Sequence, residues 1–354
     1  MVYDIAIIGL GPAGSTLARN LSRDLKVAAV DMKSLDGKDG FKKPCGGLLA
    51  PDAQRVLAEE NLTLPNSVLA NPQIFCVNTL DLGSSLKRKY QRTYINMNRH
   101  KFDLWLASLI PSDVRVFDRS KCLEITKVDN HFKVVFTQNK EKKEIFAKYV
   151  VGADGANSYV RKKFFKTPIR QYVCIQKTFL SSHSHDVDYV CFFDKDITDC
   201  YGWIDYKDAH CQMGVALPKK HTNQNFKTLQ EKLTKRGFFF DEEVYKEACL
   251  VNSPTSINEL VCGKDGIFLV GEAAGFISPS SLEGISYAMD SGRKLATVLN
   301  QNTQNPNKEY EKSCRKLKLK IALKILKAPF ILNSKLRWLV MKSGASSLNG
   351  KNTH

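Results

Sequence analysis

Residues 3–31 read YDIAIIGLGPAGSTLARNLSRDLKVAAVD. The apolar run that ends at Ile8 predicts a β-strand, and the residues after the glycine-rich turn predict a helix to about Arg23. Residues 26–30 predict a second strand, and Asp31 stands at its end. This order of strand, glycine turn, helix, strand and acidic residue is typical of a βαβ unit that binds a nucleotide.

The three glycines of the turn have separate physical roles. Gly9 permits the tight turn, Gly11 lets backbone amides approach a pyrophosphate, and Gly14 allows the helix to pack closely on the strand, while the helix N-terminus adds a favourable dipole. Asp31 follows Gly9 by 22 positions, where a carboxylate can accept hydrogen bonds from ribose hydroxyls. Glycines at a turn are commonly only structural, but the flanking strand, helix and acid favour dinucleotide binding.

The composition is that of a folded globular protein. The chain has 354 residues, which suggests about two domains, and 43% hydrophobic and 25% charged residues exclude collagen-like, low-complexity and disordered classes. No segment approaches the roughly 20 uninterrupted apolar residues of a membrane-spanning helix, and the N-terminus leads straight into the nucleotide motif, so we expect a cytoplasmic protein. Ten Cys without a C-x-x-C pair or zinc-like spacing predict reduced thiols, no structural disulfide and no metal.

Much of the positive charge lies near the C-terminus. The formal net charge is +17, and eleven Lys and Arg against two Glu between Lys308 and Lys342 account for +9 of it. A polar stretch, residues 300–307, predicts a linker before this basic tail. If residues 309–328 form a helix, apolar side chains make one stripe and lysines occupy a neighbouring face; these are Leu317, Ile321, Ile325 and Ala328, and Lys316, Lys320, Lys324 and Lys327.

Two interpretations of the basic tail stay open. The apolar stripe could dock on the protein body and leave the lysines in water. A basic amphipathic helix is also suited to anionic lipid headgroups, which would place the protein peripherally at the inner face of the cytoplasmic membrane. Nucleic-acid binding is the poorer explanation, because no recognition module accompanies the charge.

Two further motifs indicate which dinucleotide is bound. Residues 150–161 read VVGADGANSYVR and resemble the Asp-Gly fingerprint of the flavoprotein hydroxylase superfamily, with Asp154 and Gly155 at its centre. Residues 271–275 read GEAAG and, followed by Pro279, resemble the third FAD motif of that superfamily. The resemblance implies an FAD-binding domain of the Rossmann type, similar to that of p-hydroxybenzoate hydroxylase.

The same resemblance implies roles for individual residues. In that superfamily the carboxylate of the third motif bonds the ribityl chain, and here Glu272 takes the place of the usual Asp. The next helix, which opens near Gly284 and Ile285, would point its N-terminus at the pyrimidine edge of the flavin and stabilise the reduced anion. Arg99 resembles an arginine that reaches the FAD phosphate region in relatives; the alternative is a surface ion pair with Asp103.

A loop near residue 45 narrows the choice among the flavoprotein families. Residues 43–49 read KPCGGLL, and the Pro-Cys-Gly-Gly run resembles that of geranylgeranyl reductases, where it lies beside the isoalloxazine ring. Gly46 and Gly47 would let the loop lie flat on a planar ligand, and the thiol of Cys45 could contact the ring or the substrate. The alternative for Cys45 is an inert, small hydrophobic residue.

A second stretch of the geranylgeranyl reductases, Tyr-x-Trp-x-Phe-Pro leading to Gly-x-Gly, lines an elongated apolar cavity. Tyr201, Trp203 and Gly214 match this pattern. Residues 205–206 are Asp-Tyr in place of Phe-Pro, and Ala216 replaces the second Gly. Trp203 could equally belong to an ordinary core.

Taken whole, the chain resembles the CbrA-type subgroup of the FAD-dependent geranylgeranyl reductase-like flavoproteins, which belong to the aromatic hydroxylase superfamily, on residues 43–54, 108–111 and 271–287. The implied fold is α/β, with a Rossmann-type FAD-binding domain, an inserted antiparallel-sheet substrate domain and a C-terminal helical tail. The expected boundaries are residues 1–75, 95–166 and 257–300 for the discontinuous FAD-binding domain, 76–94 and 167–256 for the substrate domain, and 301–354 for the basic helical region.

The resemblance implies an FAD-dependent oxidoreductase that reduces carbon–carbon double bonds of an apolar, prenyl- or isoprenoid-like small molecule or lipid. Two alternatives stay open: an NAD(P)H- and oxygen-dependent aromatic monooxygenase, and a flavin-binding or sensing protein without turnover. No second G-x-G-x-x-G follows a strand, so electrons would come from external NAD(P)H or reduced ferredoxin.

All of the candidate site residues are expected to lie beside the flavin or its phosphates. No metal ligand is expected among them. The residues expected to bind the cofactor are Gly9, Gly11, Pro12, Ala13, Gly14, Asp31, Gly46, Gly47, Arg99, Asp154, Gly155, Gly271, Glu272, Gly284 and Ile285, and those expected to take part in catalysis are Cys45, Tyr201 and Trp203.

Overall fold

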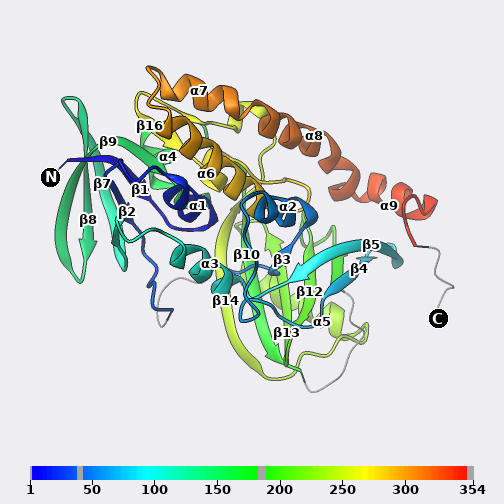
Figure 1. The fold of residues 1–354 in the computed structure, drawn as a ribbon. Helices are drawn as coiled ribbons and strands as arrows, with labels where there is room; N and C mark the ends of the chain where they lie inside the picture. The colour runs from blue at the N-terminus through cyan, green and yellow to red at the C-terminus, as the bar shows by residue number, and fades with distance from the viewer. Residues whose placement is uncertain (1, 38–42, 182–188, 349–354) are drawn as a thin grey trace. The chain divides into compact units, whose positions relative to one another are not determined.

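The structure, a computed structural model, describes residues 2–37, 43–181 and 189–348. The chain forms two compact units, and most of their elements are labelled in Figure 1. Each unit is built around a sheet of its own. Unit 1 consists of residues 1–41, 101–170 and 252–325, and unit 2 consists of residues 42–100, 171–251 and 326–354.

The sheet of unit 1 contains the βαβ unit predicted from residues 3–31. β1 (Val2–Ile8) pairs in parallel with β2 (Val27–Val30) and β9 (Glu141–Gly152), and α1 (Pro12–Asn20) connects β1 to β2. The other elements of this unit include β6 (Arg115–Phe117), β7 (Ser120–Val128), β8 (His131–Gln138), α4 (Tyr159–Phe164), β15 (Gly263–Lys264), β16 (Ile267–Leu269), α6 (Ile285–Asn300) and α7 (Pro306–Ser313). The strand order is β15-β16-β9-β1-β2-β6, and β8 joins β7 to β9.

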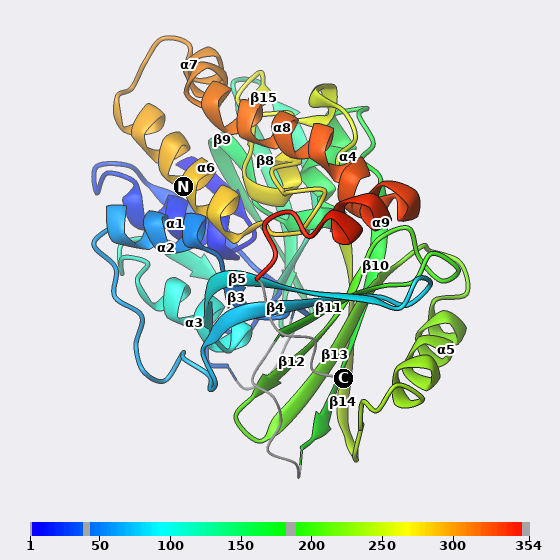
Figure 2. The ribbon, with the colours of Figure 1, turned by 90° about the vertical axis from the view of Figure 1, so that its right-hand side faces the viewer.

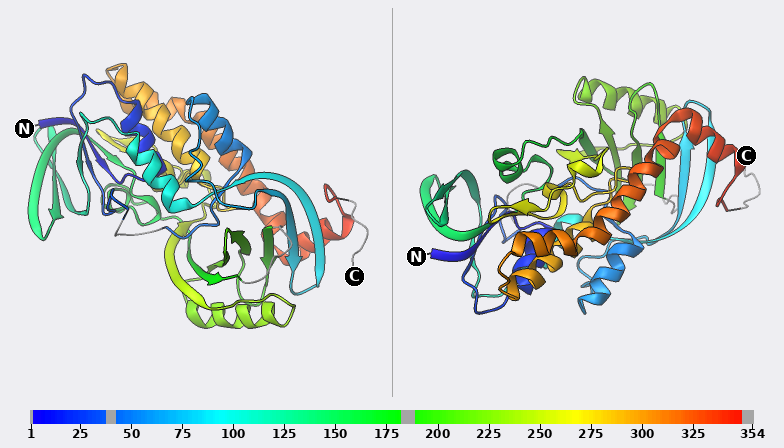
Figure 3. Two further views of the ribbon diagram at one scale, coloured as in Figure 1. Left: turned by 60° about the horizontal axis from the view of Figure 1, so that its bottom comes forward. Right: turned by 90° about the horizontal axis from the view of Figure 1, so that it is seen from above.

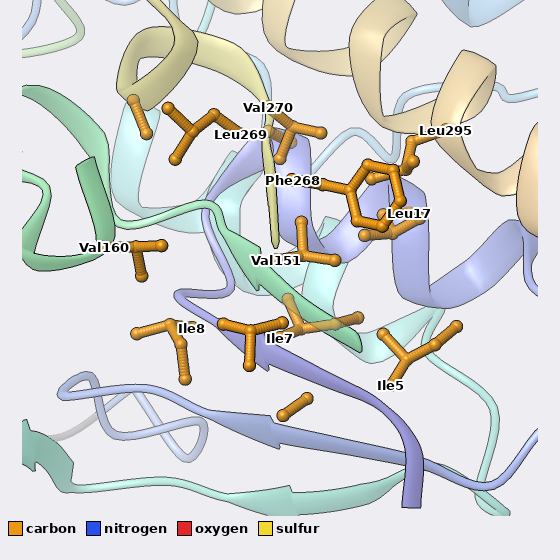
Figure 4. Close-up of a cluster of buried hydrophobic side chains, with 14 of the residues drawn as sticks. Ile5, Ile7, Ile8, Leu17, Val151, Val160, Phe268, Leu269, Val270 and Leu295 are labelled. Carbon is orange, nitrogen blue, oxygen red and sulfur yellow. The ribbon is translucent and has the colours of Figure 1, made fainter. Parts of the chain in front are cut away.

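Burial on both faces explains why the central strands are uninterrupted apolar runs. Ile5 of β1 and Val151 of β9 are 1% and 0% exposed, and a parallel strand that is covered on both faces has no polar side. Leu17 of α1, Phe268 of β16 and Leu295 of α6 belong to the same core (Figure 4). The helices and the parallel strands of unit 1 therefore fold as one layered structure.

The sheet of unit 2 confirms the predicted antiparallel region. Its strands are β3 (Leu48–Leu49), β4 (Ile74–Asp81), β5 (Leu86–Asn96), β10 (Gln171–Leu180), β11 (Tyr189–Phe193), β12 (Gly202–Lys207), β13 (His210–Leu217) and β14 (Glu243–Asn252). Their order is β14-β10-β13-β12-β11-β4-β5-β3. β13 is antiparallel to both β10 and β12, β12 is antiparallel to β11, and β11 pairs with β4 in parallel.

One face of this sheet packs on α5 (Thr222–Thr234), as Figure 2 shows. Val190, Ile204 and Met213, from three adjacent strands, share a core with Phe226 and Leu229 of α5. Side chains alternate along a strand, so the residues between these point to the opposite face. That opposite face carries polar and aromatic side chains of β10, β12 and β13.

The two units differ from the predicted domain boundaries in several places. Residues 42–75 and 95–100, expected in the FAD-binding domain, belong to unit 2. The reason is that β3, β4 and β5 pair within its sheet. The C-terminal region is not a separate part, since residues 301–325 belong to unit 1 and residues 326–354 to unit 2.

The C-terminal tail is helical, as expected, but residues 309–328 do not form a single helix. α7 ends at Ser313, and α8 (Arg315–Leu332) and α9 (Ser334–Ser343) follow it; Figure 3 shows α8 as one uninterrupted helix. The break at Cys314 coincides with the burial of Tyr310 and Cys314 in the core of unit 1. The Tyr310 hydroxyl donates to the carbonyl oxygen of Leu269 at 3.1 Å.

The expected apolar stripe of α8 packs on unit 1. Leu317 and Ile321 are 2% and 0% exposed, and Ile325 is partly buried against the same core. This is the docked arrangement, the first of the two interpretations of the tail. The other helices include α2 (Pro51–Glu59) and α3 (Arg99–Ser108), and within the described residues no helix is long and apolar enough to cross a membrane.

Candidate functional site

The glycine turn of unit 1 is shaped by close backbone contacts. Gly9 has a φ of +100°, and a Cβ at this position would lie 2.6 Å from the carbonyl oxygen of Ala153. A Cβ at Gly14 would lie 2.0 Å from the carbonyl oxygen of Gly9. The fold itself therefore requires glycine at both positions.

Gly11 differs, because the fold does not require it to be a glycine. A Cβ at Gly11 would meet no atom within 4 Å, and its φ of −71° suits any residue. Gly11 is the N-cap of α1, no side chain caps this helix, and Pro12 occupies its first turn. The first backbone N–H groups of a helix lack intrahelical partners and are suited to a phosphate. The open space and the uncapped helix start fit a pyrophosphate.

Two backbone amides hold Asp31 at the end of β2. Oδ2 of Asp31 accepts a hydrogen bond from the amide of Leu10, and Oδ1 accepts one from the amide of Lys33 at 2.6 Å. A carboxylate has about four acceptor positions, so these bonds leave capacity for ribose hydroxyls. The contact between Asp31 and a ribose stays a prediction.

The Asp-Gly motif lies before α4, from which the short 3-10 turn Gly155–Asn157 separates Asp154. The carboxylate of Asp154 accepts hydrogen bonds from the Ser158 hydroxyl at 2.5 Å and from the amides of Tyr159 and Val160 at 2.7 and 3.2 Å. Asp154 thus holds the start of α4, a structural role that the sequence pattern did not separate from cofactor binding. A Cβ at Gly155 would meet no atom within 4 Å. The cofactor contacts of Asp154 and Gly155 stay predictions.

Arg161 has a role that the motif did not indicate. Its buried guanidinium donates to the carbonyl oxygens of Thr167, Ala273 and Glu259, with the shortest distance, 2.7 Å, to Glu259. It therefore ties α4 to the third motif. Burial lowers the pKa of Arg161 to about 10, which still leaves it protonated near neutral pH. The sequence gives no signal for this role, because Arg161 is the first of three consecutive basic residues, Arg161, Lys162 and Lys163.

The third motif packs on the start of α1. A Cβ at Gly271 would lie 2.9 Å from the Cβ of Ala13, which brings the turn Gly271–Ala274 close to α1. Oε1 of Glu272 accepts the amide of Asn252 at 2.8 Å, and its carbonyl oxygen accepts from the Asn252 side chain at 3.0 Å. Glu272 is therefore anchored to Asn252, and its contact with the ribityl chain stays a prediction.

α6 provides a second helix start without a side-chain cap. Gly284 is its N-cap residue and Ile285 its first residue. A Cβ at Gly292 would lie 2.4 Å from the carbonyl oxygen of Ala13, so α6 and α1 are in close contact. The positive end of the α6 dipole is suited to an anionic ring edge.

These features of unit 1 fit FAD. The start of α1, with the open space at Gly11, would hold the pyrophosphate, and Asp31 keeps acceptor capacity for a ribose. The start of α6 would stabilise negative charge on the flavin. In the described parts of the chain no group of three or more His, Cys, Asp or Glu could hold a metal ion.

In unit 2 the predicted loop lies on Trp203. A Cβ at Gly46 would lie 3.4 Å from both Cδ1 and Nε1 of Trp203, and 3.8 Å from the ring of Tyr189. The half-buried thiol of Cys45 accepts a hydrogen bond from the amide of Gly47 at 3.4 Å. The structure thus brings together the loop and Trp203, which the sequence named separately.

Gly47 has a structural explanation, although we expected it to bind the cofactor. Its φ is +57°, and a Cβ would lie 2.3 Å from the carbonyl oxygen of Met97 and 2.9 Å from Nζ of Lys207. The buried ammonium of Lys207 donates to Oδ1 of Asn96 and to the carbonyl oxygens of Met97 and Gly47, at 3.0 and 3.4 Å for the two carbonyls. Only glycine leaves room for these contacts, and a contact with the cofactor stays a prediction.

Trp203 lies across Gly214 on β13. A Cβ at Gly214 would lie 2.2 Å from Cε2 and Cζ2 of Trp203. The Trp203 ring centre is 6.2 Å from that of Tyr201, and the indole is only 5% exposed. Tyr201 and Trp203 therefore form one aromatic wall. Gly214 and Gly46 both lie close to the indole ring of Trp203.

α3 begins at Arg99, as the predicted helix start requires. The carboxylate of Asp103 lies 2.8 Å from the ammonium of Lys33, so Asp103 takes part in an ion pair within unit 1. The contact between Arg99 and the FAD phosphates stays a prediction.

The chain matches known proteins over nearly its whole length. Protein CbrA of Escherichia coli O9:H4 (strain HS) is 49% identical over 347 residues, which are 98% of this chain and 94% of that protein. The chain belongs to the CbrA family. The family model described as Lycopene cyclase protein matches residues 4–218 of this chain, which are more than half of it, so the chain is a member of that family as well.

Solved structures share the fold of this CbrA-family chain. A geranylgeranyl bacteriochlorophyll reductase-like protein from Thermoplasma acidophilum has a TM-score of 0.73 at 21% identity, over 96% of this chain and 87% of its own. The flavin-dependent brominase Bmp2 has a TM-score of 0.70 at 18% identity, over 97% and 93%. These likenesses confirm the predicted α/β fold of FAD-binding enzymes. The three motifs predict that this fold binds FAD.

Proposed function

We propose that the protein is a reductase that adds two hydrogen atoms across a carbon–carbon double bond of an apolar, prenyl-like substrate. The observation that carries the proposal is the contact of the loop at Gly46 with Trp203 in unit 2. The loop and the tryptophan resemble two separate features of the geranylgeranyl reductases, and here they form one surface. The aromatic wall of Trp203 and Tyr201, whose rings are tilted by 55° to each other, is suited to an isoprenoid chain, because aromatic faces give a large apolar contact area.

The chain's own residues would bind and orient the reactants. FAD, when bound, supplies the two-electron redox chemistry of such a reduction. The start of α6 would stabilise negative charge, and Cys45, Tyr201 and Trp203 are the proposed catalytic residues on the substrate side. One alkene carbon gains a hydride and the other gains a proton, so that the substrate is reduced by two electrons. The external reductant would be NAD(P)H or reduced ferredoxin.

A monooxygenase that uses NAD(P)H and oxygen is the second candidate, because hydroxylases share this FAD-binding fold. A flavin-binding protein without turnover is the third. The resemblance of the loop and of the Tyr201–Trp203 pair to reductases favours the first candidate over both.

Anaerobic turnover separates the three candidates. The holoprotein would be reduced by light or dithionite without oxygen and mixed with polyprenyl lipids that carry no quinone, while flavin absorbance and product mass are followed. We expect the flavin to be reoxidised and the product to gain two hydrogen atoms. A strict need for oxygen with the gain of one oxygen atom would instead identify a monooxygenase, and no reoxidation by any compound would identify a binding protein.

A further inference from the structure

Asp205 is a buried carboxyl group on the wall that we propose for an apolar substrate. Its side chain is 0% exposed, and it stands where the geranylgeranyl reductase pattern has Phe. Trp203, Asp205 and Lys207 alternate along β12 and therefore point to one face of the sheet, opposite the face that packs on α5. Burying a carboxyl group costs free energy unless a partner satisfies it.

The register places further polar residues beside Asp205. Gln212 of β13 lies directly opposite Asp205, and Gly214 lies opposite Trp203. On β10, Gln176 is opposite Gly214, and Thr178 is opposite Gln212, to which it is hydrogen-bonded at 3.3 Å. Directly opposed side chains on neighbouring strands have Cβ atoms about 5 Å apart. Trp203, Asp205, Gln212 and Gln176 therefore form one cluster, which we call the polar row.

Each member of the polar row has a buried polar atom without a hydrogen-bond partner among the described residues. These atoms are Nε1 of Trp203, Oε1 of Gln176, Oε1 of Gln212, and Oδ1 and Oδ2 of Asp205. Buried polar atoms in native proteins are nearly always hydrogen-bonded, so several unsatisfied atoms in one cluster indicate a place for a polar ligand group.

Lys207 balances the charge of Asp205 but does not satisfy it. Its Nζ lies 3.4 Å from Oδ2 of Asp205, an ion-pair distance without hydrogen-bond geometry. An ammonium group has three donors, and those of Lys207 are directed at Asn96, Met97 and Gly47. Lys207 therefore has no donor to spare for an anionic ligand.

We propose that the polar row binds a neutral hydroxyl group at the end of the substrate; this rests on the proposed function. A hydroxyl group both accepts and donates, so it can accept from the Trp203 indole and donate to an oxygen of Asp205, Gln176 or Gln212. A phosphate brings only acceptor oxygens and negative charge, which would face the carboxylate.

The protonation behaviour of Asp205 is consistent with a neutral hydroxyl ligand. Burial raises the pKa of Asp205 to about 6, and the nearby Lys207 acts in the opposite direction. The carboxyl group can therefore serve a neutral ligand in either protonation state near neutral pH.

The test compares three probes with the holoprotein: geranylgeraniol, geranylgeranyl phosphate and the matching hydrocarbon without oxygen. Binding is measured by quenching of protein fluorescence. We expect the alcohol to bind at least about tenfold more tightly than the other two, as one net hydrogen bond to a buried charged group allows. Asp205→Leu and Gln176→Leu should reduce the affinity for the alcohol to that for the hydrocarbon.

Gln176→Leu leaves the Asp205–Lys207 pair in place, so it tests the inference even if Asp205→Leu fails to fold. Asn78→Leu is the matched control, because Asn78 lies opposite Val190 and so on the α5 face; it should retain the preference for the alcohol. Equal binding of alcohol and hydrocarbon to the wild type would overturn the inference that the polar row binds a hydroxyl group, but not the proposed function. No binding of any probe, the hydrocarbon included, would overturn the proposed function together with the inference.

A second observation, on α8, carries a separate inference. Leu319, Leu323, Leu326 and Phe330 are 60%, 51%, 70% and 54% exposed, and their spacing of four, three and four residues makes one stripe along the helix. This outer stripe is distinct from the buried stripe of Leu317 and Ile321. Large exposed apolar surfaces of this kind usually mark an interaction site.

Lysines flank the outer stripe. Lys316, Lys320 and Lys327 are exposed, and the tail from Lys308 to Lys342 has a net charge of +9. In α9, Trp338 and Leu339 are also exposed, at 37% and 56%. We infer that the outer stripe inserts into an anionic membrane surface, with the lysines at the lipid headgroups, because apolar insertion and charge attraction add in such binding.

Vesicle sedimentation tests the membrane inference. We expect the holoprotein to bind vesicles of phosphatidylglycerol and phosphatidylcholine, to bind phosphatidylcholine alone weakly, and to dissociate as salt is raised, since the Debye length is about 8 Å at physiological ionic strength. Leu323→Ser with Leu326→Ser, and Lys320→Glu with Lys327→Glu, should each lower binding about tenfold or more.

Leu123→Ser with Leu180→Ser is the matched control, since these leucines are 40% and 44% exposed on other elements. Unchanged binding by both stripe variants would overturn the membrane inference. A wild-type dimer that the leucine variants convert to a monomer, without vesicle binding by either form, would assign the stripe to a second copy of the chain and would overturn it too.

Discussion

Gly11→Val is expected to weaken FAD binding strongly while the protein still folds. A valine side chain would fill the open space above the start of α1, where a pyrophosphate must approach the backbone amides. We expect the affinity for FAD to fall by on the order of 100-fold, which corresponds to about 2.7 kcal/mol. The purified variant should be colourless, and titration of the apoprotein with FAD, followed by flavin fluorescence, measures the loss.

Valine substitutions at two other glycines, Gly14 and Gly83, are the controls for this prediction. In Gly14→Val a Cβ would lie 2.0 Å from a backbone oxygen, so overpacking should destabilise the apoprotein by about 3 kcal/mol or more. Gly11→Val should change the stability of the apoprotein by only about 1 kcal/mol, as for a poorer N-cap residue. Gly83→Val, in a turn of unit 2, should retain FAD. Full FAD occupancy in Gly11→Val would show that the pyrophosphate does not bind here.

Arg161→Met is expected to destabilise unit 1 strongly. The substitution leaves the carbonyl oxygens of Thr167, Ala273 and Glu259 without their donor. Each buried acceptor that loses its partner costs at least about 1 kcal/mol, so the free energy of unfolding should fall by about 3 kcal/mol or more. Urea denaturation of the apoprotein, followed by intrinsic fluorescence, measures the change.

Two further variants distinguish the hydrogen bonds of the Arg161 guanidinium from the effect of its positive charge. Arg161→Lys keeps the positive charge but lacks the planar set of donors, so it should recover only part of the lost stability. Lys162→Met removes an exposed charge at the next position and should alter stability by no more than about 0.5 kcal/mol. If Arg161→Met were as stable as Lys162→Met, the contact between α4 and the third motif would not contribute to stability.

The βαβ unit could be predicted because its signals are local. The apolar strand, the turn glycines and the helix that starts at Pro12 lie within about thirty residues, and each follows from backbone preferences that act over a few residues. The antiparallel sheet of unit 2 could also be predicted, since aromatic and β-branched runs with polar punctuation are typical of strands. The sequence could not predict that residues 42–100 belong to unit 2, because this depends on the pairing of β3, β4 and β5 within a sheet whose other strands are distant in the chain.

The roles of single residues divide in the same way. The sequence assigned Gly9 to the tight turn, Gly14 to helix packing and Gly11 to the pyrophosphate, and the close contacts at Gly9 and Gly14 with open space at Gly11 agree with this division. Asp154 was predicted from its motif to bind the cofactor, and the structure adds local hydrogen bonds from Ser158 and Tyr159 to its carboxylate, which hold the start of α4.

By itself the sequence determined the dinucleotide motif, the order of the FAD motifs and the excess of charge in the tail, because each is written in neighbouring residues. Only the tertiary structure decided that Arg161 joins three carbonyl groups, that α8 has one buried and one exposed apolar stripe, and that Asp205 lies beside Gln212 and Gln176. These facts depend on which segments, far apart in the chain, the hydrophobic core and the strand register bring into contact.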